Sequence, residues 1–245
     1  MPKCIFCLTT NKGVFNTKEH ILPESLGGGD WAILPEGLYC DKCQNIFGSS
    51  IEQQALANYP FVNLRTLLGI PTKKNKTPWF KYMEGILRSG GEPGKLVYQP
   101  NDYFKKAYES GQKTLTIIPA MPRKTDMVLR MLLKIGLETI AADNGAEKVF
   151  ESRFDAARTY ALTGKKETRW SYLQVEDTSK LNIYIKGIAA DDEPFFIDIY
   201  DYDVNCEFLH LRVLYLEFYV PLIEHCVVDP NDVSAFPSRT QIVVV

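Results

Sequence analysis

Residues 4–45 read CIFCLTTNKGVFNTKEHILPESLGGGDWAILPEGLYCDKCQN, and this stretch decides the N-terminal fold. A Cys-x-x-Cys pair stands at each end, Cys4/Cys7 and Cys40/Cys43, with 32 residues between the two pairs. Each pair can supply two thiolates, and four thiolates complete the tetrahedral shell of one zinc ion. Because such a shell leaves no open position, we expect a zinc ion that holds structure and performs no chemistry.

A glutamate followed directly by a histidine lies inside the loop between the two cysteine pairs. The loop also contains a run of three glycines, which lets the backbone turn sharply. In order and spacing, this pattern resembles the HNH endonucleases, the zinc-stabilised branch of the ββα-metal nucleases, over residues 1–58. The matching motifs are Cys4-x-x-Cys7, Glu19-His20-Ile21-x-Pro23, Gly27-Gly28 and Cys40-x-x-Cys43 followed by Gln44-Asn45-x-x-Gly48.

The resemblance implies a catalytic centre at Glu19 and His20. His20 would be the general base, because an imidazole ordinarily takes up a proton near neutral pH. Glu19 would bind a catalytic Mg²⁺ or Mn²⁺, metals that prefer oxygen ligands. Neighbours in a strand point to opposite faces, so the two side chains share a site only where the strand ends or bends. The resemblance implies such a bend.

The sequence departs from the family pattern at two positions. The family places an Asn or His metal ligand directly after the last zinc cysteine, and here that residue is Gln44. Either Gln44 ligates through its longer amide or Asn45 does so after a shift of one residue. We favour Asn45, whose other common use is to cap a helix. The family's central Asn corresponds to Pro35, while Glu52 on the following helix is a candidate to support the site.

Charge is distributed unevenly along the chain. Residues 54–125 contain 12 basic and 4 acidic residues, a balance of +8, whereas residues 126–245 have a balance of −8. A lysine-rich segment is often only solvated surface. Beside a nuclease motif, it is also where contacts with DNA phosphates are expected, because lysines release counterions when they neutralise the backbone. The lysines predicted to bind DNA are Lys73, Lys74 and Lys76.

The fold class predicted is α+β. A zinc-bound ββα-metal module over residues 1–58 is followed by a mixed domain over residues 59–245, in which a helical pair packs on a β-sheet. Helices are predicted at residues 44–58, 125–142 and 146–162. Strands are predicted at residues 18–21, 33–39, 80–87, 95–98, 114–118, 181–185, 195–200, 209–220 and 240–245.

Other features indicate a cytoplasmic protein. No apolar run approaches the ~20 residues of a membrane span, and a zinc ligand at Cys4 leaves no room for a signal peptide. Zinc thiolates need a reducing compartment, and Cys206 and Cys226 match no disulfide framework. His210 and His225 lie outside any motif, so we expect them to be structural.

Two functions are consistent with this pattern. The favoured one is a metal-dependent HNH endonuclease that cleaves DNA, for which the resemblance implies a setting in restriction or phage defence. Residues 59–245 would then recognise the substrate, regulate cleavage, or bind a partner protein or a second copy of the chain. The alternative is a zinc-finger module that binds nucleic acid or protein without catalysis. A purely structural zinc ribbon, however, has no need of the Glu-His pair.

Overall fold

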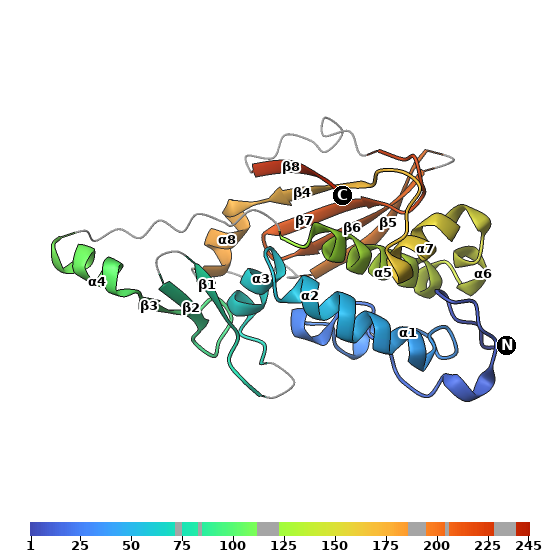
Figure 1. Cartoon of the computed structure of the whole chain (residues 1–245), viewed down its shortest axis with the longest axis horizontal. Coiled ribbons are helices and arrows are strands. Elements are labelled where there is room, and N and C mark those ends of the chain that lie inside the picture. Colours follow the sequence, from blue (N-terminus) through green and yellow to red (C-terminus); the bar gives the residue numbers. More distant parts are fainter. Residues whose placement is uncertain (72–74, 83–84, 112–122, 186–194, 204–205, 228–238) are drawn as a thin grey trace.

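The computed structural model describes the chain except for residues 72–74, 83–84, 112–122, 186–194, 204–205 and 228–238. The described residues form helices and two antiparallel sheets, one of three strands and one of five; Figure 1 shows their arrangement. The predicted α+β class is therefore confirmed. A helix of 19 residues, α5 (Thr125–Asp143), lies between the N-terminal module and the five-stranded sheet.

The N-terminal module has less regular strand structure than predicted. Its strand pairing is reduced to one antiparallel bridge, between His20 and Ile33. The strand predicted at 33–39 is therefore wrong, because turns before the second cysteine pair occupy most of that segment. The helix begins at residue 41, three residues before the predicted start. The elements are η1 (Lys12–Val14), η2 (Glu24–Leu26), η3 (Asp30–Ala32) and a continuous helical run through α1 (Asp41–Ile46), η4 (Phe47–Glu52) and α2 (Gln53–Leu56).

A three-stranded sheet and a short helix project from the body of the molecule (Figure 1). The strand predicted at 80–87 is instead a hairpin of two strands, and the strand predicted at 114–118 lies outside the described residues. The helices on either side of this sheet were not predicted. The elements are α3 (Phe61–Leu68), β1 (Trp79–Tyr82), β2 (Gly85–Ser89), β3 (Leu96–Pro100) and α4 (Asp102–Glu109).

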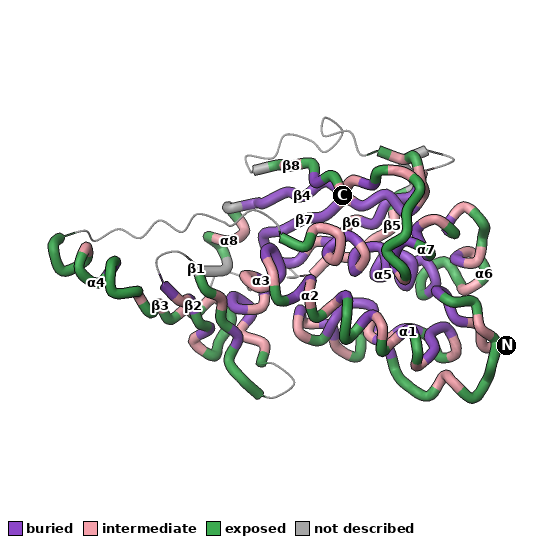
Figure 2. The backbone as a smooth tube through the Cα atoms, in the orientation of Figure 1, coloured by how far each residue is buried: buried purple, intermediate pink, exposed green. Residues whose placement is uncertain are grey.

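The predicted helical pair packs on the larger sheet. Its first helix, α5, contacts three strands of that sheet, and α7 (Asp155–Thr163) packs along α5. The three strands are β5 (Phe195–Asp203), β6 (Cys206–Val213) and β7 (Leu216–Pro221). Residues around the whole circumference of α5 are buried, which is typical of a central helix (Figure 2). The second predicted helix is broken near Glu151 into α6 (Ala146–Val149), η5 (Ser152–Phe154) and α7 (Asp155–Thr163).

The five-stranded sheet has the order β5-β6-β7-β4-β8. The long strand predicted at 209–220 is a hairpin that turns at Leu214, a residue with a left-handed backbone (φ 55°). The strand predicted at 181–185 is wrong: α8 forms there, and the Asp177 side chain accepts a hydrogen bond from the Ser179 amide at its start. The elements are β4 (Ser171–Glu176), which was not predicted, α8 (Thr178–Ile185), β5 (Phe195–Asp203), β6 (Cys206–Val213), β7 (Leu216–Pro221) and β8 (Arg239–Val244).

One hydrophobic core runs from the N-terminal cysteines through α5 to the larger sheet. The division at residue 58 stays a prediction. The β6–β7 hairpin brings Cys206 and Cys226 together as a disulfide with a Cα–Cα distance of 5.8 Å, although their sequence spacing suggested no pairing. Within the described residues, no helix is both long and apolar enough to cross a membrane.

Candidate active site

The four predicted zinc ligands converge in the folded chain. The Sγ atoms of Cys4, Cys7, Cys40 and Cys43 all lie within 4.8 Å of one another. A tetrahedral zinc ion with Zn–S bonds of ~2.3 Å places its sulfurs roughly 3.8 Å apart. The Cys7 and Cys40 sulfurs are separated by 3.5 Å, so the cluster has the size that zinc requires.

The thiols strongly perturb one another. The hydrogen bond from the Cys43 thiol lowers the pKa of Cys4 to about 5. That same hydrogen bond raises the pKa of Cys43, and burial raises the pKa of Cys40 to about 11. One thiolate therefore forms easily, whereas four adjacent thiolates coexist only around a cation. This donor set fits a divalent zinc ion, which the four thiolates would hold.

Helix α1 braces the chain just before the Glu-His pair. The Asp41 carboxylate accepts hydrogen bonds from the Asn16 amide and the Thr17 hydroxyl, each at 3.0 Å. The Asn16 side-chain amide donates a further bond to Asp41 at 2.8 Å. That side-chain bond contributes most to lowering the pKa of Asp41, and the bonds from the Asn16 backbone amide and from Thr17 lower it further. One turn later, the Gln44 side-chain amide donates to the Lys18 carbonyl at 2.9 Å. The helix that follows the second cysteine pair therefore holds the chain segment before Glu19 in place.

His20 is half-buried at the bridge to Ile33. Two backbone hydrogen bonds flank this bridge: the Ile21 amide donates to the Ala32 carbonyl, and the Leu34 amide donates to the Glu19 carbonyl. The imidazole retains 24% of its side-chain exposure, with Nδ1 4.0 Å from a Glu24 carboxylate oxygen. The ring is therefore held on a defined backbone and is open to solvent on one side.

Glu19 points into the protein instead. Its carboxylate lies 2.6 Å from the ammonium of Lys134, a fully buried residue of α5. The same ammonium lies 2.9 Å from Glu52 and 3.2 Å from Glu138, and it donates to the His20 carbonyl at 3.3 Å. We call these four side chains the Lys134 cluster. It joins the Glu-His segment, the helix after the zinc site and the central helix.

Three carboxylates surround one ammonium in this cluster. Burial by itself would lower the pKa of Lys134, but the three carboxylates outweigh burial and raise that pKa well above its usual value. Burial also raises the pKa of Glu138. Both Glu138 oxygens lie outside hydrogen-bonding geometry although one is within ion-pair distance of the ammonium. The lysine is thus the main compensation for several buried negative charges.

Each of the predicted divalent-metal ligands has its own surroundings in the folded chain. Glu19 is engaged by Lys134, the Gln44 amide nitrogen is engaged by Lys18, and Asn45 is exposed on α1. Among the described residues, the cysteine cluster is the one group of three or more Cys, His, Asp or Glu side chains close enough to hold a metal. The divalent-metal roles of Glu19 and Asn45 therefore stay predictions.

Other predicted positions fall outside this centre. Lys76 is exposed, whereas Lys73 and Lys74 lie outside the described residues. His210 stacks on Tyr219 and lies 3.0 Å from the Glu217 carboxylate, on the larger sheet. His225 is exposed. Neither histidine is part of the cluster around Glu19.

Sequence reasoning missed Lys134, Glu138 and the bracing role of Asp41. A signal for the first two was present: Lys134 and Glu138 are four residues apart in an otherwise apolar helix, the spacing of an ion pair. Such charges in a buried helix need partners from other elements. Which elements supply those partners is a tertiary property.

Comparison with known proteins agrees with the residue pattern. Residues 4–60 match the family model described as HNH endonuclease. The chain matches no curated protein and no solved structure. The resemblance to the HNH endonucleases predicted for the first quarter of the chain is therefore confirmed, over residues 4–60.

Proposed function

We propose that the protein is an endonuclease that hydrolyses DNA phosphodiester bonds, with His20 as its general base. The observation that carries this proposal is the position of His20 in the HNH domain. The histidine lies on a backbone bridge, beside a chain segment that α1 braces, and its ring reaches solvent. These are the conditions under which an imidazole can take a proton from an attacking water.

Hydrolysis needs a deprotonated water in line with the leaving oxygen. His20 would hold the proton removed from that water, and the Glu24 carboxylate lies 4.0 Å from its Nδ1. A bound Mg²⁺ or Mn²⁺ would supply the positive charge that offsets charge on the phosphoryl oxygens. Glu19 and Asn45 are the residues that would hold that metal, and no step is assigned to it.

Glu19 has two candidate roles that one substitution separates. As a partner of Lys134 it stabilises the fold, and as a metal ligand it supports cleavage. In Glu19→Gln the shape is kept but the charge is lost. If the carboxylate binds the catalytic metal, the folded variant will have lost nicking, and raised Mn²⁺ will restore part of it. If the Glu19 carboxylate only pairs with Lys134, the melting temperature of the variant will fall while its folded fraction nicks DNA at the normal rate.

Plasmid nicking tests the proposal directly. Supercoiled DNA is incubated with the full-length protein and Mg²⁺ or Mn²⁺, or with EDTA added at the start of the reaction. His20→Ala should lower the nicking rate by ~10²–10⁴, the usual cost of losing a positioned general base. Zinc content and DNA binding should stay near wild-type values. His225→Asn is the matched control, because Asn tolerates the left-handed backbone at that exposed histidine (φ 72°).

Nicking by His20→Ala at the wild-type rate would remove His20 from the chemistry and favour binding without cleavage. The Gln44 side chain gives that alternative some support, because its nitrogen holds the Lys18 carbonyl and so gives this residue a structural task. A role in restriction or phage defence is part of our proposal. Methylated, unmethylated and phage-derived DNA should then be cut at different rates.

A further inference from the structure

The outer face of the three-stranded sheet carries one row of exposed side chains. In the antiparallel register, Trp79 of β1 lies opposite Arg88 of β2, which lies opposite Val97 of β3. Directly opposed residues share a face of the sheet. All three are exposed, and Trp79 and Val97 retain 50% and 53% of their surface. A tryptophan so open to solvent on a regular strand is unusual for a residue that normally buries a large area.

The other face of this sheet is packed. Leu87 is buried there, and α3 lies against β1 and β2. At the far end Tyr98 meets Phe104 of α4 edge to face, with ring centroids 5.8 Å apart. The packed face anchors the sheet to the body, so the row through Trp79 is presented outwards. Figure 2 shows that α4, in this projecting part, is largely exposed.

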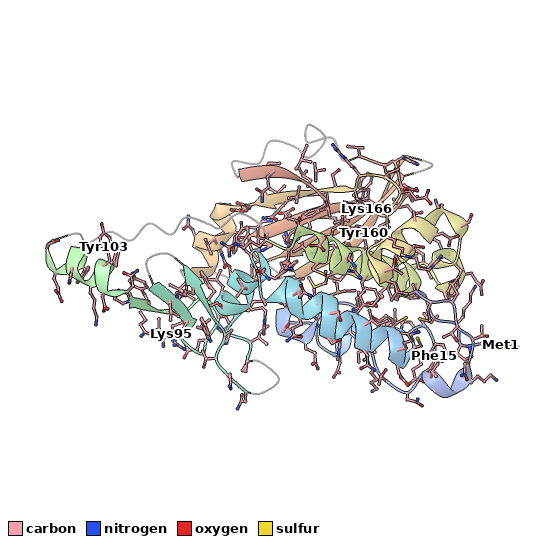
Figure 3. All side chains as sticks on the ribbon, viewed as in Figure 1. Met1, Phe15, Lys95, Tyr103, Tyr160 and Lys166 are labelled. Atoms are coloured by element: carbon pink, nitrogen blue, oxygen red, sulfur yellow. A yellow bond between two sulfur atoms is a disulfide. The ribbon has the colours of Figure 1, made fainter. Side chains whose placement is uncertain are left out.

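The outward face is positively charged. The three strands contain Lys81 and Arg88 and no Asp or Glu, and Lys81 shares a face with Trp79 because the two are two residues apart. Lys95, beside the sheet in Figure 3, is 62% exposed and pairs with Glu92 in the adjoining turn. The Arg88 guanidinium lies 5.7 Å from the Trp79 ring centre. Lys76, predicted from the sequence to contact phosphate, is exposed three residues before Trp79.

We infer that this face binds an unpaired stretch of DNA, with Trp79 stacking on a base and Arg88 and Lys81 contacting the flanking phosphates. The inference rests on the proposed nuclease function and assigns part of its substrate recognition. Aromatic side chains interleaved with cations on an open sheet are suited to single strands, because stacking needs a base face that a duplex hides. The positive charge of this face is complementary to a nucleic acid and also to an acidic surface of another protein. The exposed Trp79 ring favours the nucleic acid, because it can stack on a base.

The test measures binding apart from cleavage. Fluorescence anisotropy of labelled single-stranded (dT)20 and of a 20-base-pair duplex is recorded with the full-length protein and no added Mg²⁺ or Mn²⁺. Trp79→Ala should weaken single-strand binding roughly 5- to 150-fold, the range for loss of one base–aromatic stack. Trp79→Phe should keep most of the affinity. Arg88→Ala should reduce the salt slope by about one, whereas Arg169→Ala, an exposed control on another surface, should change neither.

Wild-type single-strand affinity in Trp79→Ala overturns the inference. So does an equal loss for single strand and duplex, because that pattern indicates contact with phosphate alone. A Trp79→Phe variant as weak as Trp79→Ala also contradicts stacking. Loss of nicking in His20→Ala leaves these binding results untouched, so the two proposals fail separately. Circular dichroism verifies that each variant is folded.

Discussion

Replacing Lys134 by methionine should strongly destabilise the protein. Methionine nearly preserves the volume of the side chain but removes the one ammonium that contacts Glu19, Glu52 and Glu138 at 2.6–3.2 Å. Lys134 and Glu138 are fully buried, so water cannot replace the lost partner. The three carboxylates would then face one another without compensation, and at least one would have to take up a proton.

The size of the effect follows from those distances. At an effective dielectric constant of about 20, unit charges 3 Å apart attract by roughly 5–6 kcal/mol. Desolvation of the buried ions offsets most of that attraction, but removing one partner of a buried ion pair still costs roughly 3–5 kcal/mol. For a chain of this length each kcal/mol lowers the melting temperature by roughly 2–4 °C. Lys134→Met should therefore melt roughly 6–20 °C below wild type.

Thermal unfolding followed by circular dichroism, together with urea titration, measures this change. Lys165→Met, at an exposed position, is the matched control and should melt like wild type. Adding Glu138→Gln to Lys134→Met should recover part of the loss, because it removes one uncompensated charge. If Lys134→Met unfolds within about 0.5 kcal/mol of wild type, a surface-like effect, the lysine does not hold this cluster together.

Three further predictions concern other parts of the chain. Reductively purified protein should carry about one zinc per chain by metal analysis, and Cys40→Ser should lose the zinc and unfold the N-terminal module. Gly28→Ala should destabilise the glycine loop by roughly 1–3 kcal/mol in urea titration, because the added Cβ would lie 1.7 Å from the Leu22 carbonyl oxygen. Burial opposes ionisation of Glu217, but its bond with His210 and a nearby lysine lower its pKa from 4.5 to about 2. The ionised Glu217 carboxylate therefore stabilises the fold above pH 4.5, and this stabilisation is lost as the pH falls towards 2. The difference in unfolding free energy between wild type and Glu217→Gln should be about 3 kcal/mol near pH 6 and should shrink over that range.

The sequence by itself determined the features that depend on local spacing. Two Cys-x-x-Cys pairs at this separation can close around one metal, and the fold brings all four sulfurs within 4.8 Å. The apolar recurrence over residues 125–142 predicted α5, because a helix buried by its neighbours must be apolar along most of its length. Local signals failed where they conflicted: residues 181–185 alternate like a strand, but the cap at Asp177 starts a helix.

Only the tertiary structure decided what surrounds the Glu-His pair. Adjacent residues on an extended segment point apart, so His20 faces solvent while Glu19 enters the core. The residue that meets Glu19 there, Lys134, lies more than a hundred positions further along the chain. No spacing rule links positions so distant. Their contact exists because the apolar surfaces of α5 and the N-terminal module are buried against each other, and this burial brings the charged side chains together. Burial then makes the pairing obligatory, since a carboxylate removed from water needs a cation.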